Sequence, residues 1–352
     1  MMDWTRDQQK DIVKKILYYS GYYSLYEHLH KPSENHLLIL MFHNVVDDAQ
    51  QSHWFAGGTP SRTQFEAVLI TLKSYYRVVS VEDAVREIRD NGKLREKSAA
   101  ITLDDGYSSA YKIVFPLLRK YDITATIFLP TDWIDGRLTP WWLALTVMID
   151  QCDLTMDTVT KVEKIMGRSV GLDANSLRVP ATAKRVLLVN LRGDLMRKND
   201  ATCDRILQEL RGALIQWGEP ATCIEEPMTW EQVSEMGAYG IRFGAHTCSH
   251  SNLSHVNLET AEREIVESKS IIERHLGTEV AGFAYPYGDD VAGYRRLKPV
   301  LEKHDFRYAC TSWPGYVNSA SSLYLLGRIS IPITSSPAII ARTLSLEYTS
   351  KL

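Results

Sequence analysis

Two adjacent carboxylates stand where a buried strand is expected to end. Asp104 and Asp105 follow the apolar run A-A-I-T-L and precede Gly106. Because successive side chains of a strand point to opposite faces, neighbouring aspartates can serve one site only where the strand ends and the chain turns. Two close carboxylates repel each other, so a cation or a shared proton is expected between them, and a metal is the better candidate.

A pair of histidines strengthens the metal interpretation. His246 and His250 lie four residues apart in G-A-H-T-C-S-H, a spacing that one helical turn brings to the same side. With Asp105 they would make three ligands and leave a coordination position open, as in a catalytic zinc-type site that hydrolyses. Asp-Asp-Gly alone is often a turn and H-x-x-x-H alone is often chance, but both at the ends of predicted strands favour a functional site.

Three stretches together resemble the polysaccharide deacetylase family, also called the NodB homology or carbohydrate esterase 4 family. They are the Asp-Asp-Gly segment, the H-T-x-x-H segment and A-G-F-A-Y-P-Y-G at 281–288. The resemblance runs from about His43 to Arg328 with a long interruption. It is closest to the branch with F-x-Y-P-Y-G and R-I-S-I, rather than to the chitin deacetylase branch. Members of this family hydrolyse the acetamide group of an amino sugar.

The resemblance implies roles for the carboxylates and imidazoles. Asp104 would be the general base, and Asp105, His246 and His250 would bind one divalent metal. Zn²⁺ is the first candidate, and Co²⁺, Ni²⁺ and Fe²⁺ are the others. Cys248, between the histidines, is expected to be a packed thiol rather than a fourth ligand.

Five aromatic or cyclic residues are candidates for contacts with the substrate. In Y-P-Y-G, Tyr287 stands where the backbone N–H of the family polarises the oxyanion, and Tyr285 and Pro286 beside it are expected to contact substrate. Trp141 and Trp142 form either the core of their own segment or a surface that faces sugar or lipid, since aromatic clusters do both.

Two positions depart from the family pattern. The arginine that usually orients the base is replaced by Ala284, and the last motif, G-R-I-S-I-P, holds Arg328 instead of the histidine that usually acts as general acid. We predict that Arg328 reaches Asp104 from the last strand, because arginine pairs with carboxylates in a forked geometry. His43, at the end of the first predicted strand, is the candidate acid. The alternatives are a surface ion pair for Arg328 and a hydrogen-bonded core histidine for His43.

Strand-like and helical segments alternate along most of the chain, as in βα units. Helices such as 258–276 separate the strands. Strands are predicted at 37–45, 77–80, 99–103, 124–130, 241–246, 280–285, 307–311 and 325–331. Seven or eight strands predict an α/β fold, a distorted TIM-like (β/α) barrel, which is also the fold of the family. The carboxylates and imidazoles would meet at the mouth formed by the carboxyl ends of its strands.

The barrel is predicted to comprise residues 37–136 and 224–352. Residues 1–36 indicate a helical extension that packs on the barrel, with a membrane-surface helix as the alternative. Residues 137–223 lack strand-like runs and indicate a mainly helical insertion at the barrel mouth. Loops at that end usually carry substrate contacts, so this insertion is expected to govern substrate choice.

Composition limits the partners and the compartment. A net charge of -3 without a long basic run gives no support for nucleic-acid binding. Five scattered cysteines indicate a reducing compartment. The acidic start M-M-D-W and the lack of an apolar run of roughly 18 residues predict a cytoplasmic protein, with peripheral contact at the inner face of the membrane left open. The oligomeric state is not fixed by the sequence.

The sequence therefore predicts a metal-dependent hydrolase that removes N-acetyl groups from an amino sugar. The substrate would be a polysaccharide, an oligosaccharide or a lipid-linked glycan precursor. One alternative is hydrolysis of another carbon-nitrogen amide, such as a sugar formamide or a small linear amide. Another is a non-catalytic carbohydrate-binding relative, although retention of the base and all three ligands favours catalysis.

Overall fold

The computed structural model describes residues 35–50, 59–198, 200–215, 225–288, 290–331 and 334–346. Its centre is a seven-stranded sheet in the order β1-β3-β4-β5-β6-β7, with β2 paired to β3. The strands are β1 (Leu37–Phe42), β2 (Arg77–Val78), β3 (Ser98–Leu103), β4 (Thr126–Leu129), β5 (Arg242–Ala245), β6 (Gly282–Ala284) and β7 (Tyr308–Cys310). All pairings are parallel, and the sheet curls strongly into a half-barrel. The predicted α/β barrel-like fold is confirmed.

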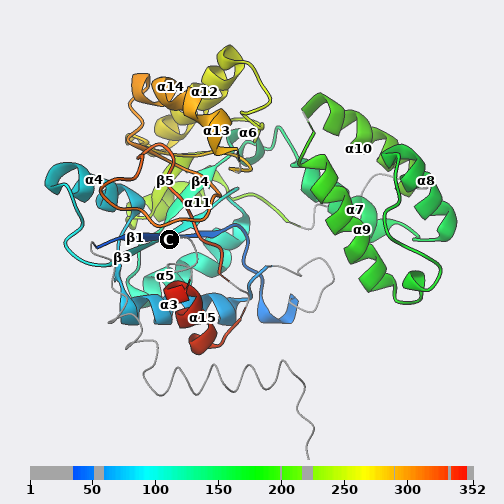
Figure 1. Ribbon diagram of the computed structural model, residues 1–352, viewed down its shortest axis with the longest axis horizontal. Helices are drawn as coiled ribbons and strands as arrows, with labels where there is room; N and C mark the ends of the chain where they lie inside the picture. Colours follow the sequence, from blue (N-terminus) through cyan, green and yellow to red (C-terminus); the bar gives the residue numbers. More distant parts are fainter. Residues whose placement is uncertain are drawn as a thin grey trace, which may run out of the picture.

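Helices follow the strands and cover the outside of the curl (Figure 1). They are α3 (Arg62–Tyr75), α4 (Val81–Asn91), the π-helix η3 (Ala110–Val114), α5 (Phe115–Tyr121), α11 (Trp230–Ala238), α12 (Leu258–Leu276), α13 (Val291–Tyr294), η5 (Arg295–Leu297), α14 (Lys298–Lys303) and α15 (Pro337–Leu346). Two short helices, η1 (Asp48–Gln50) and α6 (Thr131–Ile134), lie after β1 and β4. The helix predicted at 258–276 has those bounds, because Asn257 caps its first turn and Gly277 ends it with a φ of 66°.

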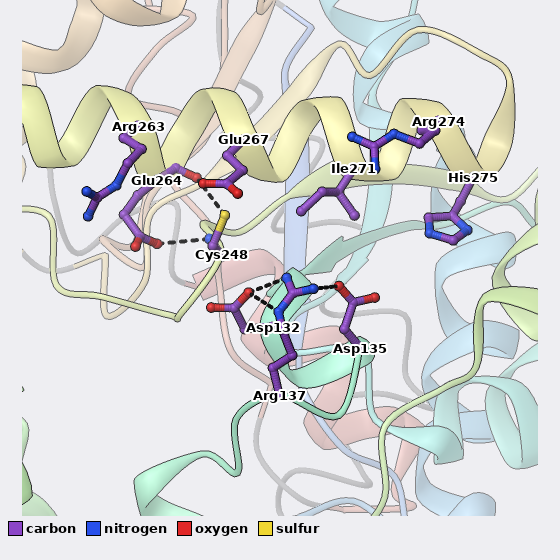
Figure 2. A pocket seen from close by; sticks show the side chains of 10 residues that line it. All are labelled: Asp132, Asp135, Arg137, Cys248, Arg263, Glu264, Glu267, Ile271, Arg274 and His275. Carbon is purple, nitrogen blue, oxygen red and sulfur yellow. Dashed lines mark hydrogen bonds and ion pairs between the residues drawn. The ribbon is translucent and has the colours of Figure 1, made fainter.

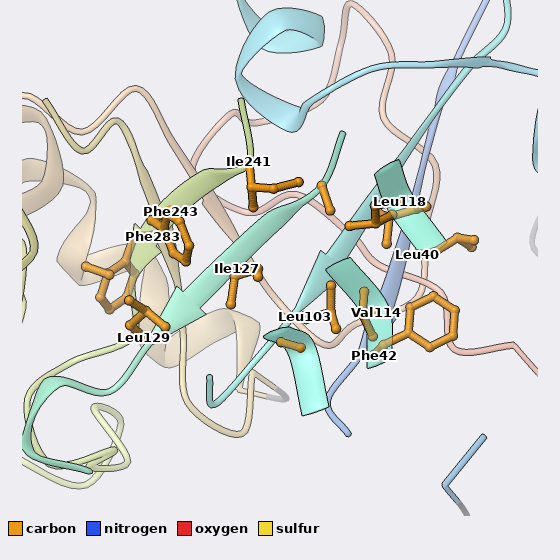
Figure 3. Close-up of a cluster of buried hydrophobic side chains, with 14 of the residues drawn as sticks. Leu40, Phe42, Leu103, Val114, Leu118, Ile127, Leu129, Ile241, Phe243 and Phe283 are labelled. Atoms are coloured by element: carbon orange, nitrogen blue, oxygen red, sulfur yellow. The ribbon is translucent and has the colours of Figure 1, made fainter. Parts of the chain in front are cut away.

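Alternating strand residues build two cores. Leu38 and Leu40 of β1 belong to the large cluster between sheet and helices, part of which Figure 3 shows. Leu37 and Ile39 belong to a second cluster with residues of β3, β6 and β7. Burial on both faces explains why the strands are continuous apolar runs, as parallel sheets require.

The prediction of an eighth strand at 325–331 was wrong. Within the described residues this segment makes only isolated bridges, Leu326 with Cys310 of β7 and Ile329 with Leu40 of β1. Gly327 packs so closely on Gly315 that an added Cβ would lie 2.9 Å from the Gly315 Cα. Through these bridges the segment still links β7 to β1, and it carries the buried Arg328.

The predicted insertion contains four longer helices around a core of their own. They are α7 (Trp141–Gln151), α8 (Met156–Met166), α9 (Pro180–Leu195) and α10 (Asp200–Leu214), with the short η4 (Ser176–Arg178) before α9. Leu145, Val162, Leu187 and Leu210 lie in that core. Figure 1 shows these green helices gathered to one side of the sheet. The boundaries predicted for extension, barrel and insertion stay a prediction, and residues 1–34 of the predicted helical extension lie outside the described residues.

No helix in the described ranges has both the length and the apolar character needed to cross a bilayer.

Candidate active site

The candidate site lies where β3 and β5 end. Asp104 and Asp105 follow β3 directly, and His246 follows β5. Asp105 and Gly106 both have left-handed backbones, with φ values of 71° and 68°. A Cβ on Gly106 would lie 2.7 Å from a Leu129 methyl group, so only glycine allows this close turn. The turn brings both carboxylates to one mouth.

Asp105, His246 and His250 form a buried cluster. Their ligand atoms all lie within 4.8 Å of one another. Asp105 Oδ1 is 3.4 Å from His250 Nε2 and 3.6 Å from His246 Nε2. It is a buried oxygen with no hydrogen-bond partner. An uncompensated buried carboxylate is costly, so a cation is the expected partner.

The protonation states suit such a cation. His246 Nδ1 lies 2.7 Å from the Ala284 carbonyl oxygen, which fixes the tautomer with Nδ1–H as donor and leaves an Nε2 lone pair facing Asp105. Burial lowers the pKa of His250, which favours its neutral ring. Burial alone would raise the pKa of Asp105, but His246 and His250 outweigh it and hold that pKa well below its usual range. One carboxylate and two imidazoles are a donor set for a divalent metal.

Arg328 forms a forked ion pair with Asp104. Its Nη1 and Nη2 lie 2.6 Å and 2.7 Å from the two carboxylate oxygens. Arg328 is 1% exposed, and its Nε donates to the Thr311 carbonyl while Nη1 also donates to Thr102 Oγ1. Burial would raise the pKa of Asp104, but Arg328 together with the nearby imidazoles outweighs it, so the pKa lies below its usual value. The structure therefore contains the expected contact, made by the segment that replaces the eighth strand.

His43 stands exposed directly after β1. Phe42 of β1 pairs with Leu103 of β3, so His43 and Asp104 follow neighbouring strands at the same edge of the sheet. Asn44, the next residue, accepts a 2.5 Å hydrogen bond from Ser109 Oγ. The chain after β1 is thus tied to the helix that follows the Asp-Asp-Gly turn.

An aromatic wall connects α7 to the imidazoles. The Trp142 ring lies 4.5 Å from that of His250, and its Nε1 donates to Tyr107 Oη at 2.8 Å. Trp141 Nε1 donates to Tyr287 Oη at 2.8 Å, and the Tyr287 ring lies 5.1 Å from that of His250. Trp142 is buried in a small cluster that contains Tyr107 and is separate from the main core of the helices. The two tryptophans therefore contact the site rather than only their own segment.

The Y-P-Y-G loop divides into buried and accessible parts. Tyr285 is stacked on Tyr294, with ring centroids 4.3 Å apart, and is 1% exposed. Pro286 is buried, and its carbonyl accepts a bond from Tyr294 Oη. This placement gives no support to substrate contacts by Tyr285 or Pro286. Tyr287 is half-buried with a φ of 65°, and its carbonyl accepts from Ser312 Oγ at 2.6 Å.

Sequence reasoning missed Tyr107, which lies beside the cluster, and Glu225, which lies beside Asn44. Tyr107 follows the Asp-Asp-Gly turn, and burial with the nearby charge of Asp105 raises its pKa well above the usual value, so it stays a neutral phenol. Glu225 bonds to the Asn44 side chain, and burial raises its pKa. The position of Tyr107, two residues after Asp105, was the only signal in the sequence for either residue.

Comparison with known proteins decides the family. The sequence profile described as polysaccharide deacetylase matches residues 91–172 and 202–309. The chain belongs to the polysaccharide deacetylase family. This deacetylase is a hydrolase, as the sequence analysis predicted. The break in the match falls at 173–201, within the helical segment beside the barrel.

Curated relatives include proteins of two bacteria. YxkH of Bacillus subtilis, whose name assigns it to the polysaccharide deacetylases, is 21% identical over 86% of this chain and 72% of its own. The poly-beta-1,6-N-acetyl-D-glucosamine N-deacetylase of Escherichia coli K12 is 33% identical over 103 residues, 29% of this chain. That match covers only 15% of the E. coli protein.

Solved structures share the fold. The Streptococcus pyogenes deacetylase PplD, in complex with acetate, superposes with a TM-score of 0.56 at 18% identity, over 88% of this chain and 99% of its own. IcaB from Ammonifex degensii gives a TM-score of 0.50 at 19% identity, over 87% of this chain and 96% of its own. At these identities the likeness shows the half-barrel fold alone.

Proposed function

We propose that this deacetylase removes N-acetyl groups from an N-acetylglucosamine-containing glycan, and that it belongs to the F-x-Y-P-Y-G and R-I-S-I branch of the family. The observation that carries the proposal is the unpartnered Asp105 oxygen facing two imidazole nitrogens, beside an Asp104 that Arg328 pairs. The substrate class is supported by the name of the E. coli relative.

The ligands would be Asp105, His246 and His250, and we propose Zn²⁺ as the ion. When bound, it would supply Lewis acidity to the amide carbonyl and lower the pKa of a coordinated water to about 7. The chain fixes the geometry for this: the Ala284 carbonyl orients His246, and the Trp142 ring packs against His250.

Asp104 is proposed to take the proton from the attacking water. A general base must be ionised at working pH, and the Arg328 pair keeps Asp104 ionised despite its burial. The forked contact also fixes the carboxylate plane, while a carboxylate retains lone pairs for the water proton. In the family, an arginine at the position of Ala284 usually orients the base. Here Arg328, on the segment between β7 and β1, would orient Asp104 instead.

We assign oxyanion stabilisation, protonation of the leaving group and sugar binding to other residues at the mouth of the barrel. The Tyr287 backbone is proposed to donate to the developing oxyanion, since its strained φ is held by Ser312 and its ring by Trp141. His43 is proposed to protonate the leaving nitrogen, because it is exposed at the same edge of the sheet as Asp104. The half-buried Trp141 would offer its face to a sugar ring.

The test is acetate release from β-1,6-linked N-acetylglucosamine oligomers by the metal-loaded and the chelator-treated protein. We expect acetate only from the metal-loaded form. Release of formate from N-formyl analogues without acetate would favour the alternative amide, and oligomer binding without either product would favour the non-catalytic relative. The cytoplasmic location stays a prediction. A cytoplasmic protein would meet lipid-linked precursors, so these belong on the same substrate panel.

A further inference from the structure

The turn between the two histidine ligands has a strained backbone. Thr247 and His250 have φ values of 66° and 59°, in the left-handed region that non-glycine residues rarely adopt. For a β-branched residue such as Thr247 the conformation is a genuine outlier. Strain of this kind persists only where the surrounding structure over-determines it.

Elements on two sides hold this turn by its peptide groups. On one side, the first amides of α6 donate to its carbonyls: Thr131 N to Thr247 O at 3.2 Å, and Asp132 N to Cys248 O at 2.9 Å. These bonds fix the carbonyls but leave the amides of the turn to be satisfied elsewhere.

The amides are satisfied by one carboxylate. Glu264 Oε2 accepts from Cys248 N and Ser249 N, both at 3.0 Å, and from Ser249 Oγ at 3.2 Å. Figure 2 shows Glu264 reaching from α12 to Cys248 at the edge of a polar pocket. Hydrogen bonds to an ionised acceptor are roughly twice as strong as neutral ones.

The helix that carries Glu264 is itself firmly placed. Ile265 and Ile272 of α12 are fully buried in the main core, and the helix is capped at both ends. In the same pocket, Arg137 pairs with Asp132 and Asp135, so those acidic charges are already compensated. Glu264 therefore transmits the position of α12 to the turn.

We propose that Glu264 is a positioning residue of the metal centre. Its carboxylate holds the peptide groups of Cys248 and Ser249 so that His246 and His250 present Nε2 to Asp105. Its hydrogen bonds go to the peptide groups of Cys248 and Ser249 and to the Ser249 hydroxyl, so it acts through the turn between the ligands. The inference rests on the proposed function for its purpose, but the contact itself can be tested without metal.

The experiment compares Glu264→Ala, Glu264→Gln and the control Glu267→Ala. Glu267 is exposed on the same helix and borders the same pocket. First, amide hydrogen exchange is measured in the metal-free full chain. We expect faster exchange at Cys248 and Ser249 in Glu264→Ala, less change in Glu264→Gln because its amide oxygen can still accept, and no change in the control.

Second, Zn²⁺ is titrated into the same proteins. Loss of a group that orients metal ligands typically costs about 10–100-fold in affinity, so that rise in Kd is expected for Glu264→Ala and a smaller one for Glu264→Gln. Wild-type exchange and wild-type Kd in a folded Glu264→Ala would overturn the proposal. Should Glu264→Ala not fold, the same two measurements on Glu264→Gln decide. If the wild type binds no Zn²⁺, the proposed function fails, and exchange alone decides whether Glu264 holds the turn.

Discussion

The two sides of the site are built in different ways. On the barrel side, Asp104, Asp105 and His246 follow strands whose ladders fix their backbones, with Asp104 N bonded to Phe42 O and His246 N to Leu129 O. On the helical side, Trp141 and Trp142 reach the site through side-chain contacts from α7.

This difference suggests that the barrel side carries out catalysis and that the helical side adjusts its rate and substrate range. Residues at the carboxyl ends of parallel strands lie at one edge of the sheet, whatever the conformation of the loops. The catalytic residues can therefore stay in place while the attached segments differ. The aromatic side chains of α7 instead come from a helical segment with a core of its own. We therefore expect changes on the barrel side to remove catalysis and changes on the helical side to modulate it.

The largest effect is expected at a ligand. His250→Ala leaves two protein ligands, too few for a tight site, so metal and activity should be lost together. Metal content by elemental analysis and acetate release on the same sample check this. A His250→Ala protein with full metal occupancy would contradict the ligand assignment.

The next effect is expected at the base. Asp104→Asn keeps the shape but cannot take a proton, so turnover should fall by roughly 10²- to 10⁴-fold while metal is retained. Turnover and metal content are again measured together. Near-normal turnover with intact metal would show that another group accepts the proton, which would break the assignment of chemistry to the β3 turn.

A smaller, pH-dependent effect is expected at Arg328. Arg328→Lys keeps the charge but loses the fork, so the stabilisation of ionised Asp104 should weaken. The pKa of Asp104, now below its usual value, would then rise, and the acid limb of the pH–rate profile would move to higher pH. An unchanged acid limb would count against Asp104 as the titrating base.

The folding stability of a second variant, Arg328→Met, tests the same ion pair independently of activity. Arg328→Met would leave a buried carboxylate unpaired, which costs about 3–5 kcal/mol of folding free energy. Because the folded pKa of Asp104 is depressed, the stabilisation by the pair is present above its unfolded pKa and is lost as pH falls through the folded value. Denaturant unfolding of wild type and variant at several pH values measures this.

The barrel side was largely predictable because its signals are local. Asp104, Asp105 and Gly106 are adjacent, and the histidines are four residues apart. The helical turn expected between the histidines was wrong, because residues 246–250 form an irregular turn with left-handed backbones at Thr247 and His250. The pairing of Arg328 followed from the convergence of parallel strands, although the segment that carries it makes isolated bridges and not the expected strand. No local pattern distinguishes Glu264 from the other charged residues of α12, because its partners are backbone amides 15 and 16 positions away.

The contacts of the two tryptophans were unpredictable for a related reason. A W-W pair at the start of an apolar helix fits a helical core as well as it fits a surface. Whether the pair packs in the helical core or faces the site depends on how α7 contacts the His246–His250 turn, which lies about a hundred residues later in the chain. Only the packing of Trp142 on His250 resolves that choice.

We expect the smallest effects from substitutions of Trp141 and Trp142. These substitutions test the difference between the barrel side and the helical side most directly. Trp142→Phe keeps an aromatic ring near His250 but removes the N–H that donates to Tyr107, so we expect a several-fold loss of turnover on polymer and small acetyl esters alike, about 1 kcal/mol for one hydrogen bond. Trp141→Phe removes the N–H that donates to Tyr287 and retains a face for a sugar ring.

If the helical segment sets substrate choice, Trp141→Phe and Trp141→Ala should separate two roles of one residue. The first loses only the anchor of Tyr287, so both substrates should slow by a similar small factor. The second also loses the stacking face, so KM should rise further for oligomers and stay unchanged for a small ester. Equal effects of Trp141→Ala on both substrates would mean that α7 supports the catalytic loop and does not bind sugar. The insertion would then count as part of the catalytic site, and the separation between the two sides would fail.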